Sequence, residues 1–546
     1  MEKQQQEKYN IIQPLLLAAC VSVGMMIGFK MNDKPQTNLL STDEYPLDSM
    51  RMTGSIEELL RFIEHKYVDT IQREELIDEA LEAIFSKLDP HSVYLSPSDV
   101  GEANDHMNGF YNGIGIENFL IDDTVNISGI LDNSPAKAAG LKVFDKIISI
   151  DGRQIAGKSL AYDVIRTLLR KSEGSEVLLE IWRDNKIFTT KIKVSEITVR
   201  SVTAHYLNDI NTGLIKIDRF GNHTYKEFME EVEKIFGSDK ARHLILDLRD
   251  NPGGYLPEAT NILCQLFEEK DKLLLYTQGR NSKRNEYKST GKRFFDIDQV
   301  VVLVDENSAS ASEIVAGAIQ DWDRGVIVGR RTYGKGLVQE QYALNNGGAI
   351  RLTTAKYFTP SGRSIQRNYK DRSKYDDDFT ERYEHGDLFY QDSTLVKNGG
   401  KYFTKVYQRE ISGSGGISPD IFIPLDTIYK DERTFEIKAL LPEFAYKYAS
   451  ANRNNIPTDQ KQFAQWRLPD DIWEKLETYL KSQSEFLSDV SASTLEGFDS
   501  DLKSKIRKYI IGNAGGADYD IDQDMFVQKA KLLIRENKQL SALKIE

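Results

Sequence analysis

Residues 300–322 read VVVLVDENSASASEIVAGAIQDW, and the fold interpretation starts from the turn inside this stretch. The first five residues are apolar and predict a buried strand, while the apolar residues after Glu313 recur at helical spacing. A turn of small residues that includes Ser308 and Ser310 therefore joins a core strand to a helix. The unpaired N–H groups of the first helical turn can stabilise an anion beside Ser310. The alternative is that Ser308 and Ser310 only cap the helix.

Strands and helices alternate on both sides of this stretch. Such alternation indicates an α/β core with a covered, largely parallel sheet. An antiparallel pair is expected after it, over 337–344 and 350–358. Residues 368–400 are polar and strongly charged, so we expect an inserted loop there. The predicted strands cover 213–220, 244–248, 273–276, 300–304 and 326–328, and the predicted helices cover 225–236 and 308–322.

Lys335 lies between two glycines in the stretch Tyr333-Gly334-Lys335-Gly336, directly after a predicted strand. The glycines leave backbone freedom, so the side chain can turn inward. A lysine amine buried without an acidic partner has a lowered pKa, and the neutral amine can accept a serine proton. Gln339 follows four residues later, where its amide can hold the amine without charging it. The alternatives are a surface lysine in a turn and an ordinary strand glutamine.

The stretch Asp247-Leu248-Arg249-Asp250-Asn251-Pro252-Gly253-Gly254 follows another predicted core strand. A glycine pair at that place exposes backbone N–H groups to a ligand. It can supply a second donor to an oxyanion. The alternative is a tight loop without a ligand.

Taken together, these motifs resemble the carboxy-terminal processing (tail-specific) serine peptidases. The matching strings are 247–254, 307–313, 333–339 and Thr359-Pro360-Ser361-Gly362-Arg363, with Leu88-Asp89-Pro90-His91-Ser92 upstream. The resemblance covers roughly residues 55–425. It implies that Ser310 is the nucleophile, that Lys335 is the general base and that Gln339 supports the lysine. It also implies that the N–H groups of Ala311 and of one glycine of the pair form the oxyanion hole, with Gly253 favoured and Gly254 close behind.

The family fold is a crotonase-like β/α core with an inserted PDZ domain. Gly113, Ile114, Gly115 and Ile116 offer N–H groups for a terminal carboxylate, and the strand after them can pair with an incoming tail. The helix expected over 161–170 forms the other wall of the groove. Arg170 is similar to an arginine that links peptide binding to active-site assembly in some family members. One departure is visible, because Phe144-Asp145 stands where Gly-Asp is usual; a small β-domain without a ligand is the alternative.

The N-terminus predicts a location. No charge occurs between Lys8 and Lys30, and the apolar run over 11–29 is long enough to span a bilayer. A signal-anchor helix is preferred over a lipoprotein signal ending at Cys20 and over a buried helix. We therefore expect a membrane-anchored, extracytoplasmic protein, on the periplasmic side of a bacterial inner membrane. The formal net charge of -13 disfavours a nucleic-acid partner.

These observations predict an α/β fold with a crotonase-like β/α peptidase core, an inserted PDZ domain, an N-terminal helical segment and a C-terminal helical extension. The expected function is that of a serine endopeptidase that cleaves protein C-terminal regions, takes substrates with free C-termini and needs no cofactor or metal. A homo-oligomer is compatible with the sequence. The rivals are a Ser-His-Asp hydrolase and a catalytically silent PDZ scaffold. The expected segments are an anchor (1–34), a tether with helices (35–107), a PDZ domain (108–195), a peptidase core (196–428) and a helical extension (429–546).

Overall fold

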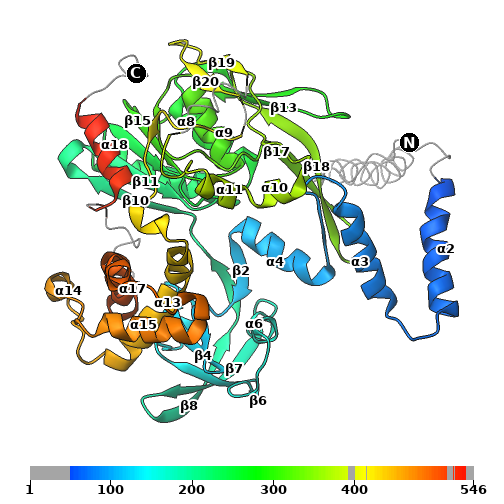
Figure 1. Cartoon of the computed structure of the whole chain (residues 1–546), viewed down its shortest axis with the longest axis vertical. Coiled ribbons are helices and arrows are strands. Elements are labelled where there is room, and N and C mark those ends of the chain that lie inside the picture. The colour runs from blue at the N-terminus through cyan, green and yellow to red at the C-terminus, as the bar shows by residue number, and fades with distance from the viewer. Residues whose placement is uncertain (1–49, 392–399, 414, 513–520, 522, 537–546) are drawn as a thin grey trace, which may run out of the picture. The chain divides into compact units, whose positions relative to one another are not determined.

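The computed structural model describes residues 50–391, 400–413, 415–512, 521 and 523–536 (Figure 1). The chain forms two units, residues 1–80 and 81–546. In the first unit, α2 (Met50–Lys66) is followed by the start of α3 (Arg73–Phe85), and Arg73 pairs with Glu57 and Glu64. None of the helices among the described residues has the length and apolarity that crossing a bilayer requires. The predicted anchor over 11–29 lies outside the described residues.

A six-stranded sheet forms the centre of the second unit. Five of its strands run parallel, and β10 pairs antiparallel at one edge. All five residues of β15 are buried, as expected for a strand covered on both faces. The predicted α/β core with a largely parallel sheet is confirmed. In spatial order the strands are β10 (Val202–Leu207), β11 (Thr212–Ile217), β12 (His243–Asp247), β15 (Val300–Val304), β16 (Val326–Gly329) and β21 (Ile421–Phe422).

Helices cover both faces of this sheet. On one face, α7 (Thr224–Val232), α8 (Leu256–Leu266) and α9 (Ala311–Asp321) share an apolar cluster with alternate residues of the strands. On the other face, α18 (Met525–Arg535) packs against the remaining strand residues, as the red helix in Figure 1 shows. This helix belongs to the predicted C-terminal extension. A segment far along the chain therefore completes the core.

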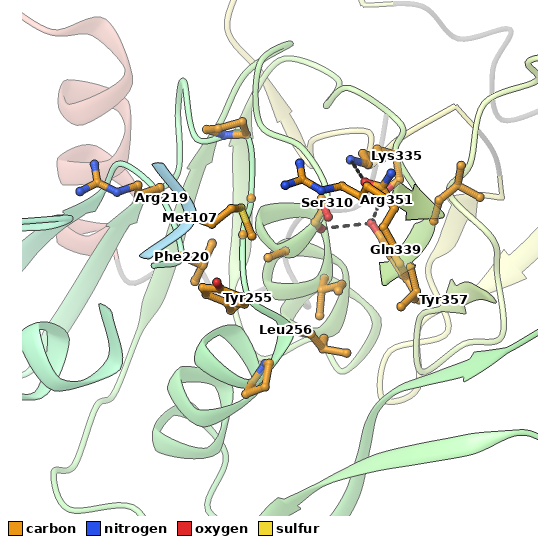
Figure 2. Close-up of a pocket in the computed structure, with 18 of the residues that line it drawn as sticks. Met107, Arg219, Phe220, Tyr255, Leu256, Ser310, Lys335, Gln339, Arg351 and Tyr357 are labelled. Atoms are coloured by element: carbon orange, nitrogen blue, oxygen red, sulfur yellow. Dashed lines mark hydrogen bonds between the residues drawn. The ribbon is translucent and has the colours of Figure 1, made fainter. Parts of the chain in front are cut away.

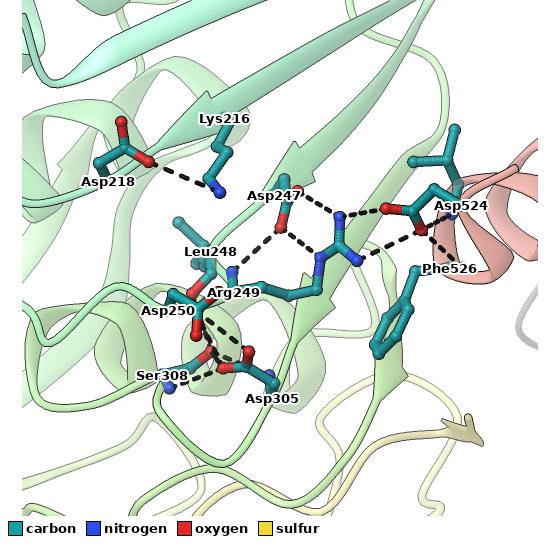
Figure 3. A network of polar contacts seen from close by, with 11 residues as sticks. Lys216, Asp218, Asp247, Leu248, Arg249, Asp250, Asp305, Ser308, Asp524 and Phe526 are labelled. Carbon is teal, nitrogen blue, oxygen red and sulfur yellow. Dashed lines mark hydrogen bonds and ion pairs between the residues drawn. The ribbon is translucent and has the colours of Figure 1, made fainter. Parts of the chain in front are cut away.

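The 247–254 loop and α18 are joined by a polar network (Figure 3). Arg249 pairs with Asp247 at 2.8 Å and with Asp524 at 2.8 Å. Asp524 also caps α18 by accepting from the N–H groups of its first turn. The Arg249 guanidinium stacks on the Phe526 ring, 4.5 Å from its centroid. The start of α18 is thus fixed to the base of the 247–254 loop.

A second, antiparallel sheet flanks the core and carries the strand that follows Lys335. The predicted pairing of 337–344 with 350–358 is confirmed, and a β-bulge between Val338 and Gln339 shifts its register. Bulges redirect side chains next to functional sites. The sheet contains β1 (Val93–Leu95), β18 (Ala349–Phe358), β13 (Lys270–Gln278) and β14 (Asn285–Thr290), with β17 (Leu337–Ala343) paired to β18. A small hairpin follows, β19 (Lys401–Phe403) with β20 (Glu410–Ser412).

The segment before the core forms a separate small sheet with its own apolar core. A ribbon of β2 (Phe110–Gly113) and β9 (Ser195–Thr198) leads into and out of it. Helices α5 (Pro135–Ala138) and α6 (Tyr162–Leu169) complete it. The strand order is β3 (Ile116–Ile121), β4 (Thr124–Ile130), β5 (Lys146–Ile150), β7 (Glu176–Arg183) and β8 (Lys186–Lys193), with β6 (Arg153–Gln154) paired to β5.

The C-terminal helices other than α18 build a cluster that packs on this small sheet. Phe144 has a φ of 76°, a conformation that suits glycine, and this residue is the departure from the family pattern. Its ring lies 5.2 Å from that of Tyr446, and Phe119 also contacts Tyr446. The unusual side chain, Phe144, therefore packs against the C-terminal helical extension. The helices are α13 (Arg433–Asn452), α14 (Gln460–Gln465), α15 (Ile472–Gln483), α16 (Ala492–Glu496) and α17 (Asp499–Ile511).

The expectation of a loop over 368–400 is partly wrong. The described part contains two short helices, α10 (Arg372–Asp376) and α11 (Asp378–Glu384). Tyr375 and Arg382, one from each helix, are buried. Polar composition suggested a solvated loop, but these two long side chains are satisfied by contacts with the core that composition does not reveal.

Candidate active site

Ser310 lies at the junction between β15 and α9, as the sequence predicts for the strand-to-helix turn. Its backbone has φ 54° and ψ −112°, which is rare for a residue with a side chain. Its N–H donates to the Glu313 carboxylate at 2.9 Å. Strain of this kind persists where the surroundings enforce it, and it is typical of functional turns.

The three serines of the turn have different surroundings. The Ser308 hydroxyl donates to the Leu248 carbonyl at 2.8 Å, and the Ser312 hydroxyl donates to the Asn251 carbonyl at 3.0 Å. Both side chains are fully buried and join the turn to the 247–254 loop. Of the three, only Ser310 lines the adjoining pocket. Ser308 and Ser312 therefore fix the turn, whereas Ser310 lines the pocket.

Lys335 lines the same pocket, which has a volume of about 530 Å³ (Figure 2). Its amine donates to the Gln339 side-chain oxygen at 2.9 Å. Burial is the main cause that lowers the pKa of Lys335, and the charge of Arg351 lowers it further. Within the part of the chain that the structure describes, no carboxylate pairs with this amine. The amine also makes no hydrogen bond to Ser310 there, so the pair shares a pocket without direct contact.

Gln339 is held by a residue far away in the sequence. Its side-chain nitrogen donates to the backbone carbonyl of His91, which leaves the side-chain oxygen facing Lys335. Burial and the charge of Lys335 lower the pKa of His91 to about 4, so its ring is neutral near pH 7. An amide fixed in this way can accept from a lysine amine without adding negative charge.

Glu313 connects the serine turn to the lysine turn. One carboxylate oxygen accepts from the N–H groups of Ser310 and Lys335, and the other accepts from Gly334 and from the Thr332 hydroxyl. The four distances lie between 2.6 and 2.9 Å. Burial raises the pKa of Glu313 to about 7, although these hydrogen bonds act in the opposite direction. The carboxylate therefore fixes two backbone segments rather than neutralising a cation.

The candidate oxyanion donors meet beside Ser310. A side-chain carbon placed on Gly253 would lie 2.7 Å from Cβ of Ser310 and 2.9 Å from the Ala311 nitrogen, so only glycine fits. The Gly253 N–H already donates to the Asn251 side chain at 2.8 Å. Among the described residues, none accepts a hydrogen bond from the N–H of Ala311 or of Gly254. Gly253 and Gly254 both stay predicted donors, and the engagement of the Gly253 N–H with Asn251 favours Gly254.

A second, smaller cavity of about 90 Å³ lies on the small sheet. Gly113, Ile114, Gly115, Ile116 and Arg170 all line it, together with α6, as the sequence predicts for the two walls of a groove. Arg170 pairs at 3.3 Å with Asp105 of α4 (Pro97–Asn108) and stacks on the Tyr111 ring at 4.8 Å. The neighbouring Arg166 pairs with Glu102 of the same helix.

Comparisons with known proteins agree with this geometry. The model of peptidase family S41 matches residues 211–372, and a PDZ domain model matches residues 112–194. The chain is 34% identical to the carboxy-terminal processing protease CtpB of Bacillus subtilis over 346 residues, which are 61% of this chain and 70% of the relative. The chain belongs to peptidase family S41. Its PDZ-containing fold and its class as a C-terminal processing peptidase follow from this membership.

Two further proteins are similar to this chain. The carboxy-terminal-processing protease of Bartonella bacilliformis is 30% identical over 349 residues, covering 63% of this chain and 78% of the relative. The solved photosystem II D1 C-terminal processing protease covers 70% of this chain and 90% of its own, at 23% identity and a TM-score of 0.36. With a TM-score of 0.36, this likeness does not bear on the family membership.

Sequence reasoning missed several residues that support the site of this S41 peptidase. The Glu313 bridge was not expected, although the Glu lies three residues after Ser310 in the pattern of a capping box. Arg382 of the insertion donates to the carbonyls of Arg331, Thr332 and Tyr333, and so fixes the chain before Lys335. Tyr375 contacts the His91 ring nitrogen at 2.6 Å. The inserted segment that contains α10 and α11 therefore helps to fix the turn that carries Lys335.

The motif Thr359–Arg363 lies outside the pocket. Arg363 and Asp321 form an ion pair at 2.8 Å, and both side chains are completely buried. Asp321 also accepts from the Ser361 N–H at 2.7 Å. The motif therefore fixes the end of α9 to the chain after β18, and its role is structural.

Proposed function

We propose that the chain is an endopeptidase in which Ser310 is the nucleophile and Lys335 the general base. The observation that carries the proposal is a buried lysine amine, held by the Gln339 amide and by no described carboxylate, in one pocket with Ser310. Such an amine loses its proton more readily than an exposed lysine. Ser310 supplies the hydroxyl at the N-terminus of α9, where helical N–H groups favour negative charge.

The proposed reaction is acyl transfer. The Ser310 oxygen attacks the peptide carbonyl while its proton passes to the Lys335 amine, and the resulting oxyanion accepts from the N–H groups of Ala311 and Gly254. The Lys335 ammonium then gives its proton to the leaving amine as the peptide bond breaks. Water, deprotonated by the same amine, hydrolyses the ester and restores Ser310. The amine and the hydroxyl first have to approach each other, which substrate binding can achieve.

The test is cleavage of a peptide with a free apolar C-terminus. We expect both Ser310→Ala and Lys335→Met to abolish cleavage, while Lys158→Met, a change at an exposed lysine, leaves it intact. Cleavage that survives Lys335→Met would exclude the dyad. A catalytically silent scaffold would bind the peptide and leave it uncut even in the unaltered protein.

We further propose that the PDZ groove binds the C-termini of substrate proteins. The glycine-containing 113–116 segment and the edge strand β3 support this role, because a tail can extend the sheet there. Amidating the peptide C-terminus should weaken binding to the groove. Equal binding of the acid and the amide would contradict the assignment.

The proposed location is outside the cytoplasm, with residues 11–29 as a membrane anchor. The support is the uncharged run between Lys8 and Lys30. Mass spectrometry of the mature N-terminus separates an intact anchor from a lipoprotein cleaved before Cys20. Recovery of the full-length protein in a salt-washed soluble fraction would contradict both.

A further inference from the structure

The peptidase pocket carries three basic side chains and, among the described residues that line it, no carboxylate. Lys335, Arg351 and Arg219 line it together with apolar and amide side chains. The whole chain, in contrast, has 84 acidic against 71 basic residues. Positive charge is therefore concentrated where a peptide would be cut. An uncompensated positive pocket attracts a negatively charged group of the substrate.

Arg351 is the cation best placed to bind such a group. It lies on β18, opposite Gln341 of β17, and its guanidinium donates to the Gln341 side-chain oxygen at 3.1 Å. No ion pair to it occurs within the part of the chain that the structure describes. Core arginines differ, since Arg330 pairs with Glu306 and Arg363 with Asp321. A guanidinium has five N–H donors, so most of those of Arg351 are available to a ligand.

The other two cations are less suited to the same task. Lys335 has to be neutral to act as a base, and its amine is held by Gln339. Arg219 donates to the backbone carbonyl of Val199 and lies on the opposite side of the pocket from Lys335 in Figure 2. The Arg351 guanidinium extends into the pocket on the side of Lys335 and Ser310.

We propose that Arg351 is a carboxylate-binding subsite of the peptidase pocket, so that the enzyme favours substrates with a carboxylate close to the scissile bond. This inference rests on the proposed active site. The carboxylate is either an Asp or Glu side chain or the free end of a short tail. Arg binds both in the same way, because its planar fork matches the two carboxylate oxygens.

The test uses peptides of one cleavable sequence in which a single position near the cleaved bond is Glu or Gln. We expect kcat/KM to be about 10- to 100-fold higher for Glu at one of these positions, the range of a charge-assisted hydrogen bond. Arg351→Met should remove the difference, and Arg351→Lys should keep part of it. Arg153→Met, a change at an exposed arginine of the small sheet, should leave it unchanged.

A second pair of peptides separates the two sources of the carboxylate. Both members carry Gln near the cleaved bond and end in a free acid or an amide. A preference for the acid that disappears in Arg351→Met assigns the tail end to this subsite, while one that persists belongs to the PDZ groove.

The inference is overturned if the preference for Glu survives Arg351→Met. It is also overturned if the unaltered enzyme cuts the Glu and Gln peptides equally and shows no preference for the acid that Arg351→Met removes. The proposed active site is judged separately. Cleavage of the Gln amide peptide by the unaltered enzyme and not by Ser310→Ala keeps that site intact even when the Arg351 subsite fails.

Discussion

The peptidase pocket and the PDZ groove both present basic side chains to a peptide, but they compensate the charge differently. In the groove, Arg166 of α6 and Arg170 directly after it pair with Glu102 and Asp105 of α4. In the pocket, neither Lys335 nor Arg351 pairs with a carboxylate of the described chain. The buried carboxylate of Glu313, close to Lys335, accepts from backbone N–H groups and a hydroxyl instead.

The difference follows from what each region has to do. A lysine paired with a carboxylate would keep its proton, because an opposite charge raises the pKa of an amine. The pocket avoids this by placing an amide next to the amine and by using Glu313 for the backbone. The role proposed for the groove involves no proton transfer, so its arginines can be paired with the carboxylates of α4.

Helix α4 belongs to both regions. Asn104 and Met107 line the peptidase pocket, while Glu102 and Asp105 pair with the two arginines of the groove. The Gln341 side chain of β17 also donates to Asn104 at 3.0 Å. One short helix therefore contacts both regions, and whether the two act separately can be tested at Asp105.

Lys335→Arg tests the uncharged amine with the largest expected effect. Arginine keeps the positive charge but cannot give up its proton, so the general base is lost. We expect kcat/KM to fall by about 10²- to 10⁴-fold. Lys356→Arg, at an exposed position of β18, is the control. Near-normal activity of Lys335→Arg would mean that the pocket needs a cation there and not a base.

Glu313→Gln tests whether the buried carboxylate acts on the backbone. The carboxylate oxygens accept four hydrogen bonds, whereas an amide offers one accepting oxygen and an NH₂ that faces donors. We expect kcat to fall by about 100-fold with little change in KM, because Ser310 and Lys335 are displaced from each other. Unfolding should become easier by about 1–3 kcal/mol. Glu474→Gln, on an exposed face of α15, should change neither quantity.

The sequence was sufficient for the elements with strong local patterns. Runs such as Val300–Val304 and the turn around Ser310 identify themselves through apolar spacing and small residues. The supports of the site could not be predicted in this way, because they join distant segments. Gln339 and His91 are 248 residues apart, and the link is to a backbone carbonyl, which has no residue-type signal. For the same reason, neither the buried Arg382 nor the position of α18 was expected.

The pH dependence of Arg351→Met gives a smaller and more specific effect. The charge of Arg351 disfavours the Lys335 ammonium, whereas Glu313 and Asp89 favour it. Activity should rise with pH as Lys335 loses its proton. Removing Arg351 raises the pKa of Lys335, so the rise should move to higher pH. The measurement is kcat/KM against pH for a peptide without acidic side chains. A rise in kcat/KM that stays at the same pH, or moves to lower pH, would contradict this interaction between Arg351 and Lys335.

Asp105→Asn should have the smallest effect, because the Asp105–Arg170 pair is about one-third exposed on both sides, at 35% and 34%. Pairs of this kind contribute about 1 kcal/mol or less. We therefore expect the Kd of a free-acid peptide in the groove to change by less than about fivefold and kcat to stay within twofold. Asp163→Asn, at a more exposed acid of α6, is the control. A tenfold loss of kcat in Asp105→Asn alone would contradict the separation of the two regions, since the pair would then control the chemistry through α4.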